Sequence, residues 1–371
     1  HVIPLFAAGL FVSCMFCHGE LARRKPHARR LTNFYLTIAL GGALGGVFVG
    51  AVAPRVFRGF FELPVGIAVC AILGVIAFRS LHRWVWAGWV LLTLVLGVTL
   101  WVQGQRLSRD AIYMARNFYG VLRVTQNGGL RDPHATRTLI NGTITHGVQF
   151  LDPERQNWPT TYYSRLSGVG LAIERTRRPG QRVGVIGLGA GTLAAYGLPG
   201  DYYRFYEINP LVVEVARRQF NFLVNTLAKV DIVVADARLA LEREPPQQFD
   251  VLAVDAFTGD SIPVHLLTLE AFQLYFRHLR PGGLLAVHIS NTHLDLEPVV
   301  ERLAQALHRD ALLVENEDGD DLVYGASWVL IAAQADDFNS SVLFNTGVPL
   351  RRRPGLRTWT DDYSNLFQIL R

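Results

Sequence analysis

Long apolar runs fill the chain before residue 103. Four of them contain no charged residue and approach the roughly 20 residues that a helix needs to cross a bilayer core: Val2–Cys17, Leu31–Ala53, Leu63–Phe78 and Trp84–Val102. One such run also fits a buried core helix, but four in succession predict a transmembrane helical domain over residues 1–104. The chain begins with His1 and not Met, so we expect a fragment or a processed form that lacks upstream helices.

Small residues and tryptophans agree with membrane insertion of these runs. Overlapping Gly-x-x-x-Gly pairs, which let helix backbones approach closely in lipid, involve Gly41, Gly42, Gly45, Gly46 and Gly50. Tryptophans mark the ends of the last run, as interfacial aromatic residues do; they are Trp84, Trp86, Trp89 and Trp101. The glycine spacing also favours self-association, so we expect a homo-oligomer.

A different pattern starts after the last run. Between Tyr113 and Phe150, short apolar segments alternate with Gly and Asn-Gly turns, which predicts a small antiparallel β domain over residues 105–160. Helix and strand patterns then alternate over residues 161–371, beginning with a helix around Tyr162–Arg175. This alternation predicts an α/β domain with a Rossmann-like parallel sheet and helices on both faces. The predicted strands are Arg182–Gly187, Tyr203–Glu207, Asp231–Ala235, Val251–Asp255 and Leu284–Ile289.

The turn after the first of these strands is rich in glycine. It contains Gly187, Gly189, Ala190 and Gly191 and is followed by Thr192. Glycines permit a tight turn and let backbone N–H groups approach a ligand. A dinucleotide site would have its third glycine at position 192, so the spacing fits a nucleoside sulfonium, such as S-adenosylmethionine (SAM), better than NAD. The alternative is a packing turn without a ligand.

Carboxylates stand at the ends of the next three strands. Glu207 can accept hydrogen bonds from ribose hydroxyls and Asp236 can accept one from an adenine amino group, while Asp255 opens a loop that contains Asp260. Because the carboxyl ends of parallel strands share one edge of a sheet, we expect these acids to face a single pocket beside the glycine turn. The alternatives are a helix N-terminal acid for Glu207 and a helix N-cap for Asp236.

Charge and cysteine content narrow the function classes. The net charge is +5 and the mean hydropathy is +0.21. The basic residues form no stripe with interleaved aromatic residues, so no nucleic acid partner is expected. The three cysteines lie in apolar runs and imply no disulfide framework. The spacing of Cys14, Cys17 and His18 matches covalent haem attachment, but these residues end a predicted membrane helix, so we expect neither haem nor metal.

These motifs resemble those of the polyamine aminopropyltransferases, the spermidine synthase family, and in particular its membrane-fused branch. The resemblance covers residues 110–371, and His18–Glu20 and Leu31–Gly46 are also similar to that branch. It implies a Rossmann-like fold of the SAM-methyltransferase type. It also implies that the glycine turn holds the methionine-like tail of SAM or decarboxylated SAM, that Glu207 binds ribose, and that Asp236 with its neighbour Ala237 binds adenine.

The same resemblance implies a catalytic group. Asp255 would orient and deprotonate the attacking amine, Asp260 would be a second carboxylate, and Tyr162 would lie near the amine. The segment Thr360–Tyr363 resembles the closing motif of the membrane-fused branch. Members of the family dimerise, which again favours a homo-oligomer.

Three departures from the family pattern affect the expected substrate. Ala190 stands where the family has an Asp that grips the free amine of decarboxylated SAM, and loss of such a charged hydrogen bond costs about 1.5–3 kcal/mol. That Asp would also repel the carboxylate of intact SAM. Trp158–Thr161 replaces an acid pair, and Tyr163 with Ser164 replaces a Gln-or-His-Glu pair, and these replacements disfavour recognition of a diamine.

The leading hypothesis is cleavage of the Cγ–S⁺ bond of SAM or decarboxylated SAM, with transfer of an aminopropyl-type group to an amine and release of 5′-methylthioadenosine. One alternative is a SAM lyase, in which SAM's own carboxylate attacks Cγ and gives homoserine lactone. The others are a SAM-dependent methyltransferase and a non-catalytic SAM sensor. No cofactor beyond the sulfonium substrate and no metal is expected; the expected partners are that small molecule, an amine acceptor in the transferase case, and the lipid bilayer.

Positive charge does not decide the orientation in the membrane. The loops 18–30 and 79–83 hold seven Arg or Lys residues, against five in 54–62 and 103–118, and the excess tends to stay in the cytoplasm. The charge count favours a catalytic domain outside the cytoplasm, whereas the location of SAM favours one inside it. We expect an integral protein of a bacterial inner membrane with the catalytic domain in the cytoplasm, because the ligand is there, and one run could be re-entrant.

Overall fold

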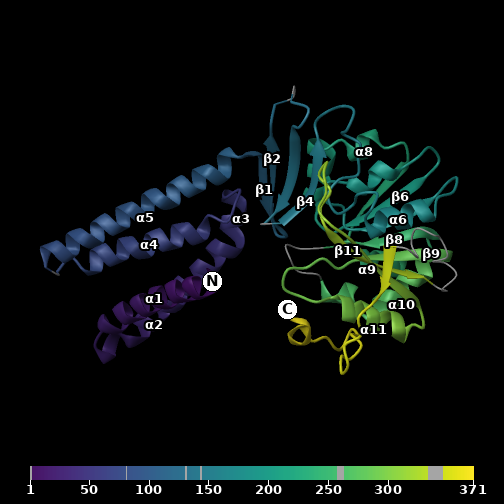
Figure 1. Ribbon diagram of the computed structural model, residues 1–371. Coiled ribbons are helices and arrows are strands. Elements are labelled where there is room, and N and C mark those ends of the chain that lie inside the picture. The colour runs from purple at the N-terminus through teal and green to yellow at the C-terminus, as the bar shows by residue number, and fades with distance from the viewer. Residues whose placement is uncertain (1, 81, 130–131, 143, 257–262, 333–345) are drawn as a thin grey trace. The chain divides into compact units, whose positions relative to one another are not determined.

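The computed structural model describes residues 2–80, 82–129, 132–142, 144–256, 263–332 and 346–371 (Figure 1). The chain divides into two compact units, His1–Val121 and Leu122–Arg371. The first unit contains the predicted apolar helices. The second contains most of the small β domain and the whole α/β domain.

Helices make up most of the first unit, as α1 (Val2–Arg23), η1 (Ala28–Arg30), α2 (Leu31–Val47), η2 (Phe48–Val52), α3 (Ala53–Val56), α4 (Glu62–Ala77) and α5 (Arg83–Arg109). The segment η2 is a π-helical turn that joins α2 to α3 without a break. Within the described residues, two helices are long and apolar enough to cross a membrane by length and composition, Ala28–Val56 and Arg83–Gln105; α4 is shorter. Membrane insertion of the four predicted runs stays a prediction.

An antiparallel sheet follows the helices. It contains β1 (Ala111–Asn117), β2 (Gly120–Asn127), β3 (Thr136–Asn141) and β4 (Ile144–Phe150), in that order. Strands β2 and β4 both pair with β3 in antiparallel register. The predicted small antiparallel sheet is therefore present, with Asn-Gly turns between its strands where the sequence indicated them.

The large sheet of the second unit has eight strands: β5 (Arg182–Ile186), β6 (Tyr202–Glu207), β7 (Lys229–Val234), β8 (Phe249–Val254), β9 (Leu279–His288), β10 (Asp310–Asn316), β11 (Ala326–Ala332) and β12 (Gly347–Pro349). Their order is β12-β10-β11-β9-β8-β5-β6-β7. Strands β5 to β9 are parallel, as predicted. The sheet as a whole is mixed, because β11 runs antiparallel to both of its neighbours. A short connection joins β10 to β11, and parallel pairing would need a crossover of a dozen residues or more.

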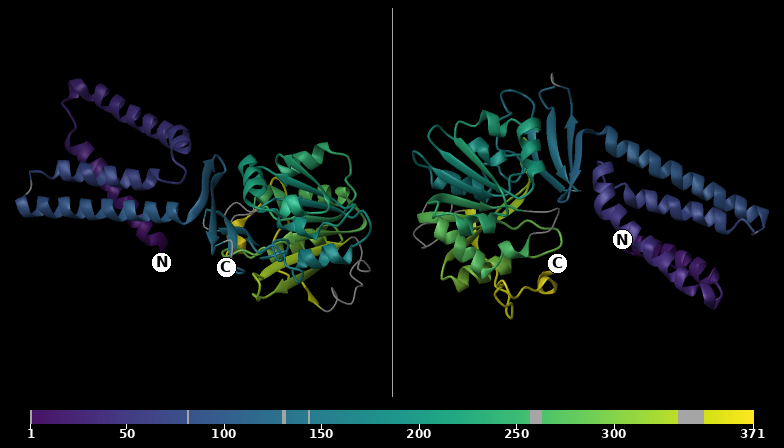
Figure 2. Two further views of the ribbon diagram at one scale, coloured as in Figure 1. Left: turned by 90° about the horizontal axis from the view of Figure 1, so that it is seen from above. Right: turned by 180° about the vertical axis from the view of Figure 1, so that it is seen from behind.

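Helices cover both faces of this sheet (Figure 2). They are α6 (Gly168–Arg175), η3 (Thr192–Tyr196), α7 (Pro210–Gln219), α8 (Phe222–Asn225), α9 (Ala237–Arg243), η4 (Val264–Leu266), α10 (Leu269–His278), α11 (Glu297–Ala306) and η6 (Leu366–Ile369). On one face, α9, α10 and α11 cover a core that includes Val329; α6 packs on the other, where Gly168 lies against Trp328. The strand order and this layering confirm the Rossmann-like fold of the SAM-methyltransferase type.

The helix predicted around Tyr162–Arg175 begins later, at Gly168, and a second helix starts in the same way. Residues before Gly168 form turns, and α6 begins there because the Ser167 hydroxyl accepts a hydrogen bond from the Gly170 N–H at 3.2 Å. Likewise, α10 begins at Leu269 after its cap Thr268. In each case a Ser or Thr N-cap sets the boundary. The turns before α6 place Tyr162 and Tyr163 near the end of β8.

Candidate active site

The glycine turn lies at the switch point of the sheet, between β5 and its neighbour β8. Gly187, Gly189 and Gly191 all have positive φ, at +98°, +53° and +85°. A Cβ on Gly187 would lie 2.3 Å from the carbonyl oxygen of Asp255, so the turn runs directly against the backbone at the end of β8. Ligands of such sheets bind at this point, outside the carboxyl ends of the strands.

Gly187→Ala is expected to destabilise the protein by about 3 kcal/mol or more, because it adds backbone strain to a steric clash with Asp255. The matched control is Gly200→Ala. Gly200 also has positive φ, at +91°, but nothing lies within 4 Å of the position that its Cβ would take, so only the strain of about 1–2 kcal/mol applies. Thermal unfolding of both variants measures the difference, and equal losses would contradict a tight approach at Gly187.

Glu207, at the end of β6, is 8% exposed. Its Oε2 accepts a hydrogen bond from the Leu188 N–H at 3.0 Å, and its Oε1 accepts one from the Asn209 N–H at 2.8 Å. The α7 N-cap is Asn209 rather than Glu207. Burial raises the pKa of Glu207, and the two N–H donors oppose that shift. Glu207 therefore holds the glycine turn in place, and a ribose contact through its remaining lone pairs stays a prediction.

Asp236 follows β7 and caps α9. Its Oδ1 accepts a hydrogen bond from the Leu239 N–H at 2.9 Å, and its Oδ2 lies 3.0 Å from Nε2 of His265. Ala237 is the buried first residue of α9. The helix-cap alternative is thus realised in the structure, and adenine binding by Asp236 and Ala237 stays a prediction.

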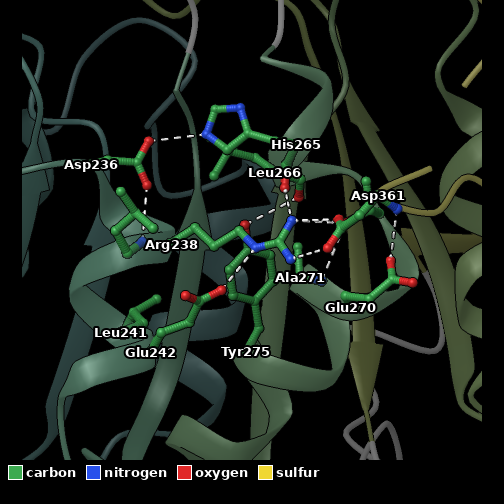
Figure 3. A network of polar contacts seen from close by, with 12 residues as sticks. Asp236, Arg238, Leu241, Glu242, His265, Leu266, Glu270, Ala271, Tyr275 and Asp361 are labelled. Carbon is green, nitrogen blue, oxygen red and sulfur yellow. Dashed lines mark hydrogen bonds and ion pairs between the residues drawn. The ribbon is translucent and has the colours of Figure 1, made fainter. Parts of the chain in front are cut away.

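A polar network ties the C-terminal segment to the residues next to Asp236 (Figure 3). The Arg238 guanidinium forms two hydrogen bonds with the Asp361 carboxylate, which also accepts one from the Thr268 hydroxyl at 2.8 Å. The Asp361 N–H donates to Glu270 at 3.0 Å. The Thr360–Tyr363 motif therefore fastens the segment across the N-termini of α9 and α10.

Asp255 lies at the centre of a buried polar cluster. Its Oδ2 accepts a hydrogen bond from the Tyr163 hydroxyl, and its Oδ1 lies 2.7 Å from Nδ1 of His288 at the end of β9. Burial raises the pKa of Tyr163, and the charge of Asp255 adds to the shift, so this hydroxyl stays protonated and donates. Both carboxylate oxygens are thus occupied by groups of the protein.

Aromatic rings enclose His288. The Tyr162 ring stacks on the imidazole with centroids 5.0 Å apart, and the Trp328 ring stacks on it at 4.6 Å. The Tyr162 hydroxyl donates to the Thr145 carbonyl at 3.0 Å, and the Trp328 indole N–H donates to the Tyr162 carbonyl at 3.1 Å. Predicted site residues Tyr162 and Asp255 therefore lie in one cluster, held by β4 and β11.

A cavity of about 680 Å³ opens beside this cluster and is lined by Asp255, Tyr162, His146, His288, Ser290, Glu315 and Glu317, among others. Neither Glu207 nor Asp236 lines it. Asp260 lies outside the described residues. Ala190 is fully buried, and its Cβ packs against Gly147 of β4. The structure thus joins Glu207 to the glycine turn and Asp255 with Tyr162 to the cavity, whereas Asp236 contacts neither.

Several residues that line the cavity were not predicted from the sequence. His288 is the last residue of the fifth parallel strand and Ser290 lies two residues beyond it, so their position at a strand end could have identified them. Glu315 and Glu317 lie at the end of β10, and His146 lies on β4. No signal in the sequence indicated that β4 and β10 border the same cavity as β8.

Comparison with known proteins found sequence similarity over part of this chain. No model of a known protein family matches the chain. A polyamine aminopropyltransferase of Vibrio vulnificus is 32% identical over 162 residues, which cover 42% of this chain and 52% of the relative. A probable polyamine aminopropyl transferase of Bifidobacterium longum is 25% identical over 158 residues, covering 42% of this chain and 33% of the relative.

The chain thus spans about half the length of the first relative and a third of the second. Among solved structures, a probable spermidine synthase from Corynebacterium glutamicum has a TM-score of 0.48 and 18% identity, covering 68% of this chain and 98% of that one. The matched part of this chain is thus similar in sequence to polyamine aminopropyltransferases.

Proposed function

We propose that the chain is a spermidine-synthase-like transferase that cleaves the Cγ–S⁺ bond of SAM or decarboxylated SAM, passes the aminopropyl-type group to an amine and releases 5′-methylthioadenosine. The observation that supports this most is the position of Asp255. Its carbonyl oxygen lies against Gly187 of the glycine turn, and its carboxylate lines the cavity. A sulfonium held at the turn would therefore present its reactive carbon to an acceptor held in the cavity.

The chemistry follows from that placement. The amine lone pair attacks Cγ in line with the Cγ–S bond, whose electrons pass to sulfur, and a neutral thioether leaves. Orienting two bound reactants in this way contributes much of the rate, and carboxylates near the sulfonium and the developing ammonium stabilise positive charge. Glu207 would hold the nucleoside end, and Asp255 with Tyr162 would hold the amine end.

Carboxylates of the cavity support an amine acceptor. Glu315 and Glu317 line it together with Asp255 and with the cation Arg371, so carboxylates lie both at its buried end and at its exposed rim. An alkylammonium group is the ligand that such oxygens favour. These two residues supply acids that the segment Trp158–Thr161 does not.

The lyase alternative is supported by a different observation. Ala190 is fully buried and places a methyl group, not a carboxylate, in the glycine turn. Nothing at that position would repel the carboxylate of intact SAM, which is the nucleophile of the lyase reaction.

The test is release of 5′-methylthioadenosine by the full chain incubated with SAM or decarboxylated SAM, each with and without putrescine. The transferase proposal expects amine-dependent release. Amine-independent release from intact SAM, with homoserine lactone as the second product, would favour the lyase, and S-adenosylhomocysteine as product would indicate a methyltransferase. Ligand-induced thermal stabilisation without any product would indicate a sensor.

We also propose that the first unit holds the protein in a membrane, with the second unit in the cytoplasm. Ala28–Val56 and Arg83–Gln105 are long and apolar, and at most 6% of their most apolar window is buried, whereas a core helix of a soluble protein is mostly buried. The full chain should stay in the membrane fraction after an alkaline carbonate wash. Its release by that wash would contradict the proposal.

A further inference from the structure

We propose that the proton of the attacking amine leaves through Ser290 and His288, and that Asp255 positions His288 instead of acting as the base itself. This inference rests on the proposed transferase function and deepens it. It starts from the fact that Asp255 has both carboxylate oxygens engaged, by Tyr163 and by His288.

The hydrogen bonds fix the protonation of the imidazole. Because Nδ1 of His288 lies 2.7 Å from an oxygen of Asp255, the neutral ring carries its proton on Nδ1 and leaves Nε2 as the acceptor. Nε2 lies 2.9 Å from the Ser290 Oγ. The acceptor nitrogen of the ring therefore points toward Ser290 and away from Asp255.

Ser290 connects this nitrogen to the cavity. Its Oγ accepts a hydrogen bond from the Ser327 N–H at 2.9 Å, so its own proton is directed to Nε2. Both Ser290 and His288 line the cavity. The sequence Asp255–His288–Ser290 thus forms a continuous chain of hydrogen bonds that ends at the space proposed for the amine.

The ring cannot turn away from this arrangement without losing two stacking partners. Tyr162 and Trp328 both stack on the imidazole, with ring centroids at 5.0 Å and 4.6 Å. Residues whose orientation is fixed by packing and by a carboxylate serve as efficient proton acceptors, because the ring needs no reorganisation during transfer.

The proposed step balances as follows. The amine nitrogen forms a bond to Cγ as the Cγ–S bond breaks, and sulfur keeps the electron pair. The new ammonium group passes one proton to the Ser290 Oγ, while the Ser290 proton moves to Nε2 of His288. The resulting imidazolium is stabilised by the Asp255 carboxylate, and its proton later returns to water in the cavity.

Several other ionisable groups face His288 or share its cavity. The ionisable residues facing it or sharing its cavity are Asp255 after β8, Tyr162 and Tyr163 before α6, His146 on β4, Glu315 on β10, Glu317 after β10, and Arg371. Burial lowers the pKa of His146, and the charge of Asp255 opposes that shift. A pH profile alone therefore does not identify the proton acceptor, so the test adds rescue by a small molecule.

The test compares His288→Ala, Ser290→Ala and the unchanged full chain, by release of 5′-methylthioadenosine with putrescine as acceptor. His288→Ala should lower kcat by about 10²- to 10⁴-fold and change the KM for the sulfonium by less than about threefold. Added imidazole should raise the rate of the His288→Ala variant by at least about tenfold, because removal of the ring leaves space for it beside Tyr162 and Trp328. Ser290→Ala should lower kcat by about tenfold or more and shift the pH profile.

The matched control is His134→Ala, since His134 is exposed and does not line the cavity; it should keep full activity. Stabilisation of each variant by 5′-methylthioadenosine shows that it is folded. If His288→Ala and Ser290→Ala are folded and keep the rate and pH profile of the unchanged chain, the relay is wrong while the transferase stands. If the unchanged chain releases no product with the amine, or releases it without one, the proposed function fails and the relay fails with it.

Discussion

Asp255→Asn is expected to lower the rate of amine-dependent 5′-methylthioadenosine release by about 10³-fold. The carboxylate accepts hydrogen bonds from Tyr163 and from Nδ1 of His288. An amide can accept only through its oxygen and must present its NH₂ group to one of these donors, which disfavours the Nδ1–H tautomer. Loss of the carboxylate from an Asp–His pair costs up to about 10⁴-fold in serine proteases. Steady-state kinetics of the full chain measures the effect.

The control for this prediction is Asp310→Asn. Asp310 is an exposed residue at the start of β10 and does not line the cavity, so its replacement should leave the rate unchanged. Ligand-induced stabilisation should persist in both variants, because Asp255 contacts the glycine turn through its backbone. An Asp255→Asn variant that is folded and retains more than about a tenth of the activity would remove Asp255 from the mechanism.

Glu207→Gln is expected to weaken binding of 5′-methylthioadenosine by about 10- to 100-fold, the equivalent of one charged hydrogen bond. The Gln amide would turn an NH₂ group toward either the Leu188 N–H or the Asn209 N–H, both of which donate to Glu207. The glycine turn would shift and one ribose acceptor would be lost. Calorimetric titration measures the affinity. The control is Glu214→Gln on α7, a half-exposed residue paired with Arg218.

The pH dependence of binding gives Glu207 a second signature. Burial raises the pKa of Glu207 above the ordinary value of 4.5. As the pH is lowered, the affinity for 5′-methylthioadenosine should therefore begin to fall at a higher pH than it would if an exposed glutamate made the contact. The contribution of Glu207 to folding stability has the opposite sign. Because its folded pKa is raised, that contribution is fully present below its unfolded pKa and is lost as pH rises through the folded pKa. If neither Glu207→Gln nor acidification changes the affinity, Glu207 does not belong to the binding site.

The sequence predicted the parallel part of the sheet well and the antiparallel part not at all. Strands β5 to β9 alternate with helices and have apolar centres, so their limits were found to within a few residues; β9 was predicted from Leu284 and begins at Leu279. No strand was predicted after Ile289. Strands β10, β11 and β12 are apolar too, but no signal in their local sequence predicts which strand each of them pairs with.

The residues of the candidate site divide in the same way. Those with a local sequence signal were predicted, whereas their contacts with distant segments were not. Asp255 and Glu207 were identified because each follows a strand of the parallel sheet, and the structure places both at the glycine turn. Asp236 follows the same rule, yet its carboxylate caps α9 and meets His265. A helix cap and a ligand contact have the same sequence signature, and only a bound adenine would separate them. Tyr162 came from the family resemblance and not from its local pattern.

The contact between β4 and the glycine turn bears on how the protein could be shortened for crystallisation. The His146 carbonyl accepts a hydrogen bond from the Ala190 N–H at 3.3 Å, and Gly147 leaves room for the Ala190 methyl group. A fragment cut at residue 161 would lose this wall and expose the turn to water. A soluble fragment should therefore start near Leu122, the first residue of the second compact unit. It then keeps most of β2 together with β3 and β4, which cover the glycine turn of the α/β domain.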